Sequence, residues 1–435
     1  MALGGGTFIT QNKILNGAYI NFISAKASNF IFGDRGYAAI GVEMDWGAEG
    51  EIITVTSDDV QSNSMKIFGY SYDAPEMKGI RDLFINAQTV YVYRLNKGGV
   101  KASNDYATAK YAGVRGNDLE IVIRANVDNE DAFDVITYLG ETVVDTQTVE
   151  DVADLVANDY VVFKSNVELE ANAGIPLANG TNGTTTGAYH QEMLDLLESY
   201  SFNVLGCTST ENSIKALYTA YAKRMRDQVG VKFQVVVHKY EQADFIGVIS
   251  VENNTIGSDK VSNLVYFITG IECACAVNKS CTNKIYNGEF VVDTDYTQNE
   301  LIAGLQSGKL MLHKVGENVR ILDDINTFVS TDSTMNADFK SNQTIRVLDQ
   351  IGNDIAKLFN EHYVGDVPND NAGRMALWSD IVDHHRALET LRAIENFDPE
   401  NITVEKGNTK KSVVVTDIVE PVNAMGILYM TVIVE

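Results

Sequence analysis

Residues 211–228 read ENSIKALYTAYAKRMRDQ, and residues 232–238, shortly after them, read KFQVVVH. The first stretch places apolar residues at the three- and four-residue spacing of one helical face, and the second is an apolar run of the length of a buried strand. Another apolar strand is predicted at 245–251, and a helix at 263–277. This alternation of strand and helix predicts a mainly parallel sheet that is covered by helices on both faces.

The sequence before this segment is punctuated by glycine and rich in residues that favour strands. Gly98 and Gly99 interrupt it, and a polar, glycine-containing run at 179–187 interrupts it again. Residues 100–178 are therefore expected to form a mostly β module with one helix at 149–156. Strands are predicted at 7–10, 18–23, 38–45, 51–56, 90–95, 119–125, 133–139 and 160–163.

The sequence after the α/β segment predicts an α+β unit. A hairpin is expected from strands at 309–314 and 318–322, and two long amphipathic helices are expected at 344–363 and 373–396. Strands are predicted to follow at 402–405, 412–420 and 427–434.

The composition excludes several classes of function. Lys and Arg number 34 and Asp and Glu number 59, which gives a formal net charge of −25 with no basic cluster, so nucleic-acid binding is not expected. The most apolar stretches, at 264–277 and 424–434, are shorter than the roughly 20 residues of a spanning helix, so no membrane insertion is predicted. The start lacks the pattern of a signal peptide, and the few cysteines do not make a disulfide framework. A protein of the reducing cytoplasm is therefore expected.

Motifs for catalysis or cofactor binding are absent from the sequence. It contains no phosphate-binding Gly-x-x-x-x-Gly-Lys-[Ser/Thr] loop and no Gly-x-Ser-x-Gly elbow. Cys273, Cys275 and Cys281 lack the Cys-x-x-Cys spacing of zinc sites, and buried packing is the favoured interpretation. Asp380 and His384 share a helical face, where a local electrostatic pair is favoured over a metal site. The sequence therefore predicts no catalytic residue, no cofactor and no metal.

The two ends of the sequence are more informative, and the C-terminal residues are the first of them. In residues 427–434, Leu428, Met430, Val432 and Val434 alternate with residues that are also mostly apolar, which is typical of a strand covered on both faces. An uncovered strand of this kind is an aggregation hazard. It is therefore expected to pair, either in its own sheet or in that of a neighbour.

The N-terminal residues have a similar character, because Tyr19, Ile20 and Phe22 lie in an extended apolar segment. Ordinary terminal strands explain both ends of the sequence. Donation of strands between subunits explains them as well, and identical joints whose rotation does not close produce a helix or a filament.

Four regions of the sequence resemble the contractile tail sheath proteins of myophages, R-type bacteriocins and defective prophage tails. Residues 5–22 (GGTF…NKILNGAYINF) resemble the sheath opening, although Asn16 stands where the family often has proline. Residues 110–117 (KYAGVRGN) are similar to the family's inserted β domain. Residues 177–183 (LANGTNG) and 202–205 (FNVL) are similar to the entry to its α/β domain. Similarity to its C-terminal domain is carried by residues 319–327, 345–349, 359–365 and 432–434.

The resemblance implies a multidomain α/β and α+β fold. It comprises a subtilisin-like α/β core without a working triad, a β-rich inserted domain, and a C-terminal α+β domain that is completed by strand exchange between subunits. The implied divisions are an N-terminal arm (1–23), an N-terminal β-rich domain (24–99), the inserted β domain (100–178), the α/β core (179–330), the C-terminal α+β domain (331–423) and a C-terminal arm (424–435). The strands implied to exchange contain Tyr19, Ile20, Phe22, Leu428, Met430, Val432 and Val434, and the implied hinges are Gly4, Gly5, Gly6 and Pro421.

The function implied by the resemblance is that of a structural subunit and not of an enzyme. Subunits are expected to stack as hexameric rings around a tail tube and to contract from a metastable extended state, driving the tube through a cell envelope. The implied partners are other copies of the chain, the tail tube protein, and baseplate and tail terminator proteins. Assembly is expected in the cytoplasm of a bacterial host, with release by lysis.

Two other classes of protein remain as alternatives. A cytoplasmic α/β hydrolase with β insertions would be a small particle with turnover, and Asp380 and His384 would be its candidate site. Another self-assembling shell or surface-layer protein would form flat lattices in place of striated tubes.

Overall fold

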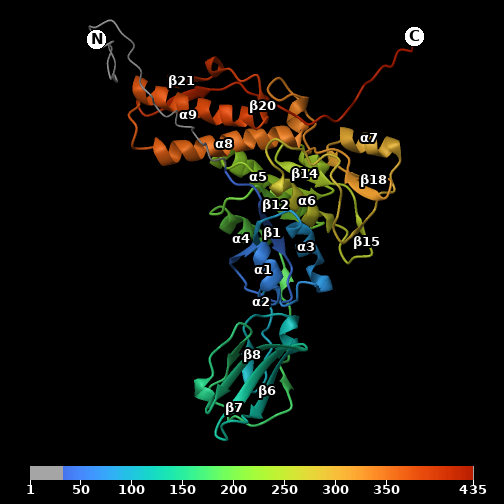
Figure 1. The fold of residues 1–435 in the computed structure, drawn as a ribbon, viewed down its shortest axis with the longest axis vertical. Coiled ribbons are helices and arrows are strands. Elements are labelled where there is room, and N and C mark those ends of the chain that lie inside the picture. The colour runs from blue at the N-terminus through green and yellow to red at the C-terminus, as the bar shows by residue number, and fades with distance from the viewer. Residues whose placement is uncertain (1–32, 435) are drawn as a thin grey trace, which may run out of the picture.

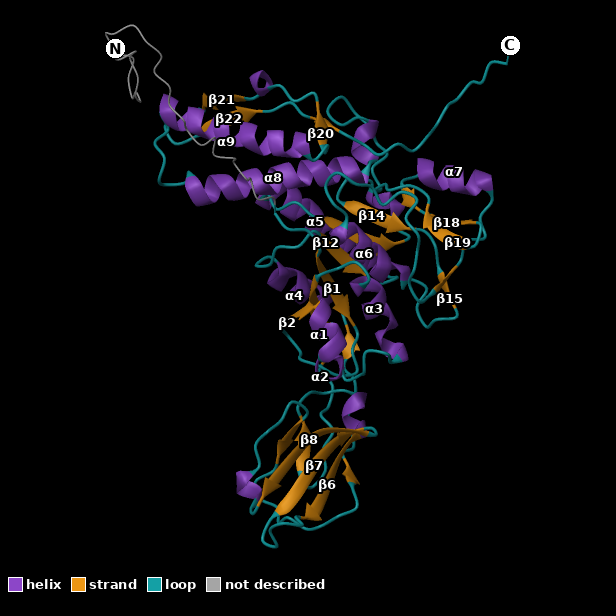
Figure 2. Cartoon of the chain, in the orientation of Figure 1, coloured by secondary structure: helices purple, strands orange, loops and turns teal. Residues whose placement is uncertain are grey.

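The computed structural model describes residues 33–434 and shows an elongated molecule in three tiers (Figure 1). An all-β domain forms one end, a mixed α/β core forms the middle, and a domain dominated by two long helices forms the other end (Figure 2). The strands predicted at 7–10 and 18–23 lie outside the described residues.

The core is built on a seven-stranded sheet with the strand order β17-β14-β13-β12-β1-β3-β2. Neighbouring strands run parallel, except that β2 is antiparallel to β3. The predicted mainly parallel sheet is thus confirmed, and strands from residues 24–99 share it with strands from the later α/β segment. The strands are β1 (Tyr37–Val42), β2 (Ile52–Thr56), β3 (Thr89–Arg94), β12 (Val204–Cys207), β13 (Gln234–His238), β14 (Val248–Val251) and β17 (Lys309–Leu310).

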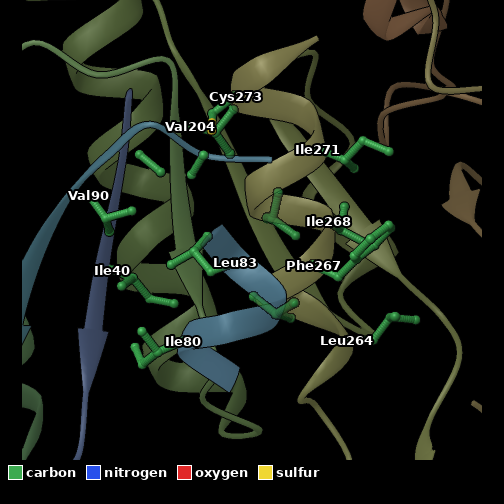
Figure 3. Packing of buried hydrophobic residues seen from close by; sticks show 14 of the residues in the cluster. Ile40, Ile80, Leu83, Val90, Val204, Leu264, Phe267, Ile268, Ile271 and Cys273 are labelled. Atoms are coloured by element: carbon green, nitrogen blue, oxygen red, sulfur yellow. The ribbon is translucent and has the colours of Figure 1, made fainter. Parts of the chain in front are cut away.

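Helices cover both faces of this sheet. Val236 of β13 belongs to a hydrophobic cluster with residues of α3 and α6, and Figure 3 shows Leu83 and Phe267 from these two helices. Val235 and Val237 point to the opposite face, into a cluster with residues of α4 and α5. The helices of the core are α1 (Ser57–Ser62), α2 (Ser64–Phe68), α3 (Lys78–Phe84), α4 (Gly187–Leu197), α5 (Asn212–Arg224), α6 (Leu264–Ala274) and α7 (Gln298–Gln306).

The all-β domain is inserted between β3 and α4. Its main sheet is four-stranded, in the order β10-β6-β7-β8, and is fully antiparallel. The helix predicted at 149–156 is wrong, because Val149 still pairs with Phe133 in the sheet and only Val152–Asp154 form a short 3₁₀ turn. Its strands are β4 (Asn96–Lys97), β5 (Ala107–Ala109), β6 (Leu119–Ala125), β7 (Phe133–Leu139), β8 (Thr142–Val149), β9 (Val161–Phe163), β10 (Ile175–Pro176) and β11 (Thr184–Thr185).

The inserted domain is joined closely to the core. Trp46 of the core is fully buried in the hydrophobic cluster of the β domain. At Gly113 the backbone has φ of 137° and passes so near the core that a Cβ atom would lie 1.9 Å from the Asp45 carbonyl oxygen. Only glycine fits this position without displacing the backbone.

The third tier contains the two predicted long helices, α8 (Asn342–His362) and α9 (Asn371–Thr390). The second ends earlier than predicted, because Arg392 adopts a positive φ of 61° and the chain turns into a strand at Ile394.

The predicted hairpin of 309–314 and 318–322 is confirmed in part. Its strands are β18 (Leu312–Val315) and β19 (Asn318–Ile321), whereas the first residues of the predicted strand, Lys309 and Leu310, pair with β14 in the core sheet as β17. The remaining strands are β15 (Thr255–Ile256), β16 (Val291–Val292), β20 (Ile394–Glu395), β21 (Thr403–Lys406), β22 (Val413–Thr416) and β23 (Glu420–Pro421).

The strand predicted at 412–420 is divided in the structure. Its first part forms β22, which pairs with β21, and its last residue begins β23, which pairs with β20. Between them the carboxylate of Asp417 turns toward His385 on α9, at 2.8 Å from Nε2. Helices of the length and apolar character needed to cross a membrane do not occur among residues 33–434.

Candidate functional site

The described part of the C-terminal arm, residues 424–434, extends away from the body of the molecule (Figure 1). The structure describes no strand at 427–434, so this predicted strand is not formed within the single chain. Exposed fractions are 83% for Leu428, 74% for Met430, 70% for Val432 and 90% for Val434. Contiguous exposed apolar side chains of this kind mark an interaction surface.

The start of α8 holds the base of the arm. Gln343 Nε2 donates to the Val422 carbonyl oxygen at 2.9 Å, and Gln343 Oε1 accepts from the Ala424 amide at 2.9 Å. The Val422 amide donates to the Ala393 carbonyl oxygen at 2.9 Å, beside the β20–β23 pair that contains Pro421. The body therefore holds the chain as far as Ala424, and Pro421 lies on the held side of that point.

The N-terminal end of the described chain meets the same helix. The Gly33 amide donates to Asp354 Oδ1 of α8 at 3.2 Å, and Arg35 donates from Nε to the Cys275 carbonyl oxygen at 2.6 Å. Helix α8 thus receives both the start of the described chain and the base of the arm. The other predicted assembly residues lie outside the described residues: Gly4, Gly5, Gly6, Tyr19, Ile20 and Phe22.

The hairpin of β21 and β22 has free edges. Val404 and Val413 turn inward onto the helices, while Val414 on the outer face is 52% exposed. In residues 33–434 no third strand joins this two-stranded sheet. Its unpaired backbone donors and acceptors form a template for another strand.

Buried ion pairs fasten α8 to the core. Arg346 Nη2 lies 2.6 Å from Glu272 Oε2 and 3.3 Å from Asp324 Oδ2, and all three side chains are almost fully buried. Arg226 adds a two-pronged pair with Asp349, with both distances 2.6 Å. Because Arg346 lies one turn beyond Gln343, these pairs connect the base of the arm directly to the core.

The protonation of this cluster follows from its burial. Burial raises the pKa of Glu272 well above its usual value, and the neighbouring Asp324 adds to the effect. Burial also disfavours ionisation of Asp324, but the charge of Arg346 and several hydrogen bonds lower its pKa overall. The cluster therefore favours one negative charge beside the guanidinium over two.

The same cluster contains the one group of potential metal ligands in the described part of the chain. Ligand atoms of Glu272, Cys281 and Asp324 lie within 4.8 Å of one another. The guanidinium of Arg346 contacts both carboxylates and takes the place of a cation. Cys281, like Cys273, is buried as predicted, whereas Cys275 is partly exposed. We interpret the group as an internal ion-pair cluster.

Asp380 and His384, which the sequence predicts to form a local pair, hydrogen-bond to residues outside their own helix. Asp380 Oδ2 accepts from the Tyr363 hydroxyl at 2.5 Å. His384 is fully buried, and its Nε2 lies 3.2 Å from Asp354 Oδ2 on α8. These contacts join α9 to α8, so the two residues contribute to packing between the helices.

A cleft of about 780 Å³ lies at the carboxyl ends of β1 and β12, where α/β enzymes commonly place their sites. One pair of charges in its wall is compensated internally, since Lys260 Nζ lies 2.5 Å from Glu43 Oε2. His190 Nδ1 bonds the Tyr218 hydroxyl at 2.9 Å, and burial lowers the pKa of His190 to about 4. Among the described residues His190 is not hydrogen-bonded to a serine or cysteine, so His190 does not activate a nucleophile in this cleft.

Sequence reasoning missed the residues that hold the arm and fasten α8. Gln343 has no motif, and the family-like stretch 345–349 that contains Arg346 gives no sign of its ion pairs, because the partners of both residues lie far away along the chain. One signal was present: Glu272 is a lone acid inside the apolar stretch 264–277. A carboxylate in such a place requires a buried cation or hydrogen-bond donor, and here it is Arg346.

Comparison with known families matches four consecutive parts of the chain to phage tail sheath proteins. The matched descriptions are "Tail sheath protein Gp18 domain III N-terminal region" at 35–95, "Phage tail sheath protein beta-sandwich domain" at 97–182, "Phage tail sheath protein central domain" at 183–327 and "Phage tail sheath C-terminal domain" at 334–435.

Individual proteins agree with these matches. The chain is 29% identical to the phage-like element PBSX protein XkdK of Bacillus subtilis (strain 168), over 99% of both chains. It is 34% identical to a sheath tail protein from Desulfitobacterium hafniense, with a TM-score of 0.83 over 94% of this chain and 97% of that one. The helical sheath of the anti-feeding prophage in the contracted state shares the fold at 11% identity, with a TM-score of 0.57 over 97% of this chain and 99% of that one.

Proposed function

The chain belongs to the phage tail sheath family, whose members are structural proteins of phage or prophage tails and not enzymes, and we propose that it polymerises as stacked hexameric rings around a tail tube. In this proposal the sheath assembles in an extended, metastable state. Contraction then drives the tube through the envelope of a target cell.

The observation that carries the proposal is the exposed arm. Its apolar residues are covered by nothing in the described part of the chain, although its alternating pattern suits a strand with two covered faces. A second copy of the chain can supply both a sheet edge and an apolar surface. Each arm then forms one joint, and a joint whose rotation does not close repeats into a helix.

The proposed acceptor is the hairpin of β21 and β22. Its free edges can accept one strand each, and the strands we assign to them are the two arms of neighbouring subunits. The C-terminal arm would contribute Leu428, Met430, Val432 and Val434. The N-terminal arm would contribute Tyr19, Ile20 and Phe22, and the C-terminal domain would be completed only by this exchange.

The arms are also the proposed hinges. Since the body holds Val422 and Ala424, the freedom needed for rotation begins at Met425 and Gly426, just beyond the implied hinge at Pro421. Gly4, Gly5 and Gly6 have the same role in the N-terminal arm. Subunits would then move as rigid bodies while the exchanged strands keep their hydrogen bonds.

Rigid-body movement requires that force on the arm reaches the core. The pairs of Arg346 with Glu272 and Asp324, one turn from Gln343, provide that connection. A gain of even a few kcal/mol per subunit, summed over many copies, would supply the work of contraction. The mechanism needs no bound nucleotide, and the core, whose mainly parallel sheet suits a subtilisin-like ancestry, needs no working triad.

The proposed partners are those of a tail. Besides further copies of the chain they are the tail tube protein, baseplate proteins and tail terminator proteins. We place assembly in the cytoplasm of a bacterial host and release at lysis, as part of a virion, a bacteriocin or a defective prophage tail.

Deletion of residues 429–435 tests the proposal. The variant should fold with an unchanged melting temperature, because residues 429–434 are exposed and form no described contact with the body, and it should form no tubes. Negative-stain microscopy and sedimentation, with the unmodified chain as control, measure the difference. Long striated tubes from the deletion variant would show that the arm is not the joint.

A further inference from the structure

The C-terminal domain has a cavity of about 460 Å³ between the end of α8, the start of α9 and the turn that joins β21 to β22. The walls are contributed by ten of the residues from Phe359 to Leu377 and by Lys410, Lys411 and Val413 of the hairpin. Its size is within the range of sites that bind small molecules or single side chains. The first strand residue in its wall, Val413, is also the first residue of β22.

One part of this cavity is basic. Arg374, Lys410 and Lys411 line it, and no aspartate or glutamate does, in a chain whose net charge is −25. Arg374 donates to the side-chain oxygens of Asn369 and Asn371, which are neutral. Within residues 33–434 none of the three cations forms an ion pair with a carboxylate. Three uncompensated cations in an acidic protein point to an anionic partner.

The other part of the cavity is apolar. Phe359, Leu377 and Val413 form its wall, and Leu377 is almost fully buried. Around them Val364 is 56% exposed and Val367 is 36% exposed. The partner that fits has apolar side chains followed by a negative charge.

We propose that this cavity receives the last residues of the arm of a second copy, with Val432 and Val434 on the apolar wall and the Glu435 carboxylate beside Lys410 and Lys411. The inference rests on the proposed function and identifies the cavity as the binding site for the end of the exchanged strand. This binding site is called the seat below. The sequence Val-Ile-Val-Glu at 432–435 has the apolar side chains and the acid in the required order. In an extended segment Val432 and Val434 point to the same side.

The seat belongs to a neighbour because of where the arm begins. Gln343, near the start of α8, holds the base of the arm, whereas the cavity is at the other end of this 21-residue helix. From its base the arm extends away from the β21–β22 hairpin (Figure 1). To fill its own cavity the arm would have to double back along roughly 25 Å of helix.

The seat also fixes the direction of the arm. With residues 432–435 beside Val413, the preceding residues pass along the free edge of β22 toward Thr416. The arm then runs antiparallel to β22 and pairs its backbone with that edge. The charge contact sets the register of the pairing, which the apolar residues alone would leave free to slip.

Charge reversal tests the basic part of the seat. Lys410→Glu with Lys411→Glu should raise the concentration needed for tube assembly by about tenfold or more, because like charges then face each other. Lys101→Glu with Lys357→Glu changes the net charge equally at exposed sites outside the cavity and should leave assembly unchanged. Adding Glu435→Lys to the first pair should restore most of the loss. Normal assembly of the Lys410→Glu, Lys411→Glu chain would overturn the proposal.

Cross-linking tests which copy fills the seat. One chain carries Val434→Cys and the other Lys411→Cys, and the two are mixed, assembled and mildly oxidised. A covalent dimer is expected only from the mixture. A single chain carrying both cysteines that cross-links internally when dilute would overturn the proposal, and so would tubes that yield no dimer.

The two proposals fail in different ways. If the cavity variants assemble normally while deletion of residues 429–435 prevents assembly, the seat is wrong and the exchanged arm stands. If the deletion variant forms tubes, the arm itself is not the joint.

Discussion

Strand β13 and the C-terminal arm are made of the same kinds of side chain but have opposite surroundings. Val235, Val236 and Val237 of β13 are fully buried, whereas Val432 and Val434 of the arm are 70% and 90% exposed. The strand has a parallel neighbour on each side, and the arm has none in the described chain. Apolar, β-branched sequence therefore specifies a tendency to form a strand, and the presence of a partner decides whether one forms.

The difference in burial between the two regions also indicates how much free energy assembly can release. Burying an apolar side chain contributes about 1.5–3 kcal/mol, and ordering each backbone residue costs about 1–2 kcal/mol. In the core this apolar surface is buried when the subunit folds. In the arm it is still exposed, so its burial against another molecule can contribute a few kcal/mol per subunit to assembly.

The largest expected effects come from placing the same charge in each region. Val236→Asp puts an unpaired carboxylate between the core sheet and helices α3 and α6 and should cost on the order of 5 kcal/mol, enough to unfold the core. Val432→Asp should leave the free energy of unfolding within about 0.5 kcal/mol of the unmodified chain and still prevent tube formation. Chemical denaturation and electron microscopy measure the two outcomes.

The Val432→Asp variant can be compared with a matched control. Val127, which is 92% exposed on the inserted domain, provides a matched control, because Val127→Asp makes the same change at another exposed valine. Tubes from the Val432→Asp chain, or a large loss of stability, would mean that the arm has a covered position within its own subunit.

The next effect concerns the junction between the two regions. Arg346→Met leaves Asp324 buried without its cation and should destabilise the subunit by about 3–5 kcal/mol. Replacing the acids as well, with Glu272→Leu and Asp324→Asn, should recover most of this loss because the uncompensated charge is gone. Thermal unfolding of the single and triple variants measures the difference, and equal stability of the two would contradict the ion-pair interpretation.

The contrast between the regions also explains what could be predicted from sequence. Periodicity identified the strands 232–238 and 245–251 and the two long helices, because their burial pattern is set by neighbours within the same segment. It failed at 149–156, where the partner strand lies on the other side of a turn and the local pattern resembles a helix. For the arm, periodicity predicted the strand but not the absence of a partner in its own chain.

The contacts around α8 were beyond prediction for a related reason. Gln343 contacts Ala424, and Arg346 contacts Glu272, across long separations in the sequence. No local pattern distinguishes Gln343 from any other polar residue at the start of a helix. Only Glu272, an acid within an apolar stretch, indicates that a buried partner is needed, and it does not specify which residue that partner is.

The smallest expected effect is on the pH dependence of the free energy of unfolding, which should depend on the core and not on the arm. Burial lowers the pKa of His190 in the folded core to about 4, from about 6.5 in an unfolded chain. Between these values the unfolded state binds more protons, so the free energy of unfolding falls as the pH drops from 6.5 toward 4. His190→Gln keeps a partner for Tyr218 and removes the titration, so the unmodified chain should lose about 2–3 kcal/mol more than this variant between pH 7 and pH 4. The arm contains no histidine. Deletion of residues 429–435 should therefore leave this acid-induced loss of stability unchanged. A smaller loss in the deletion variant would mean that the arm contributes to the fold of its own subunit.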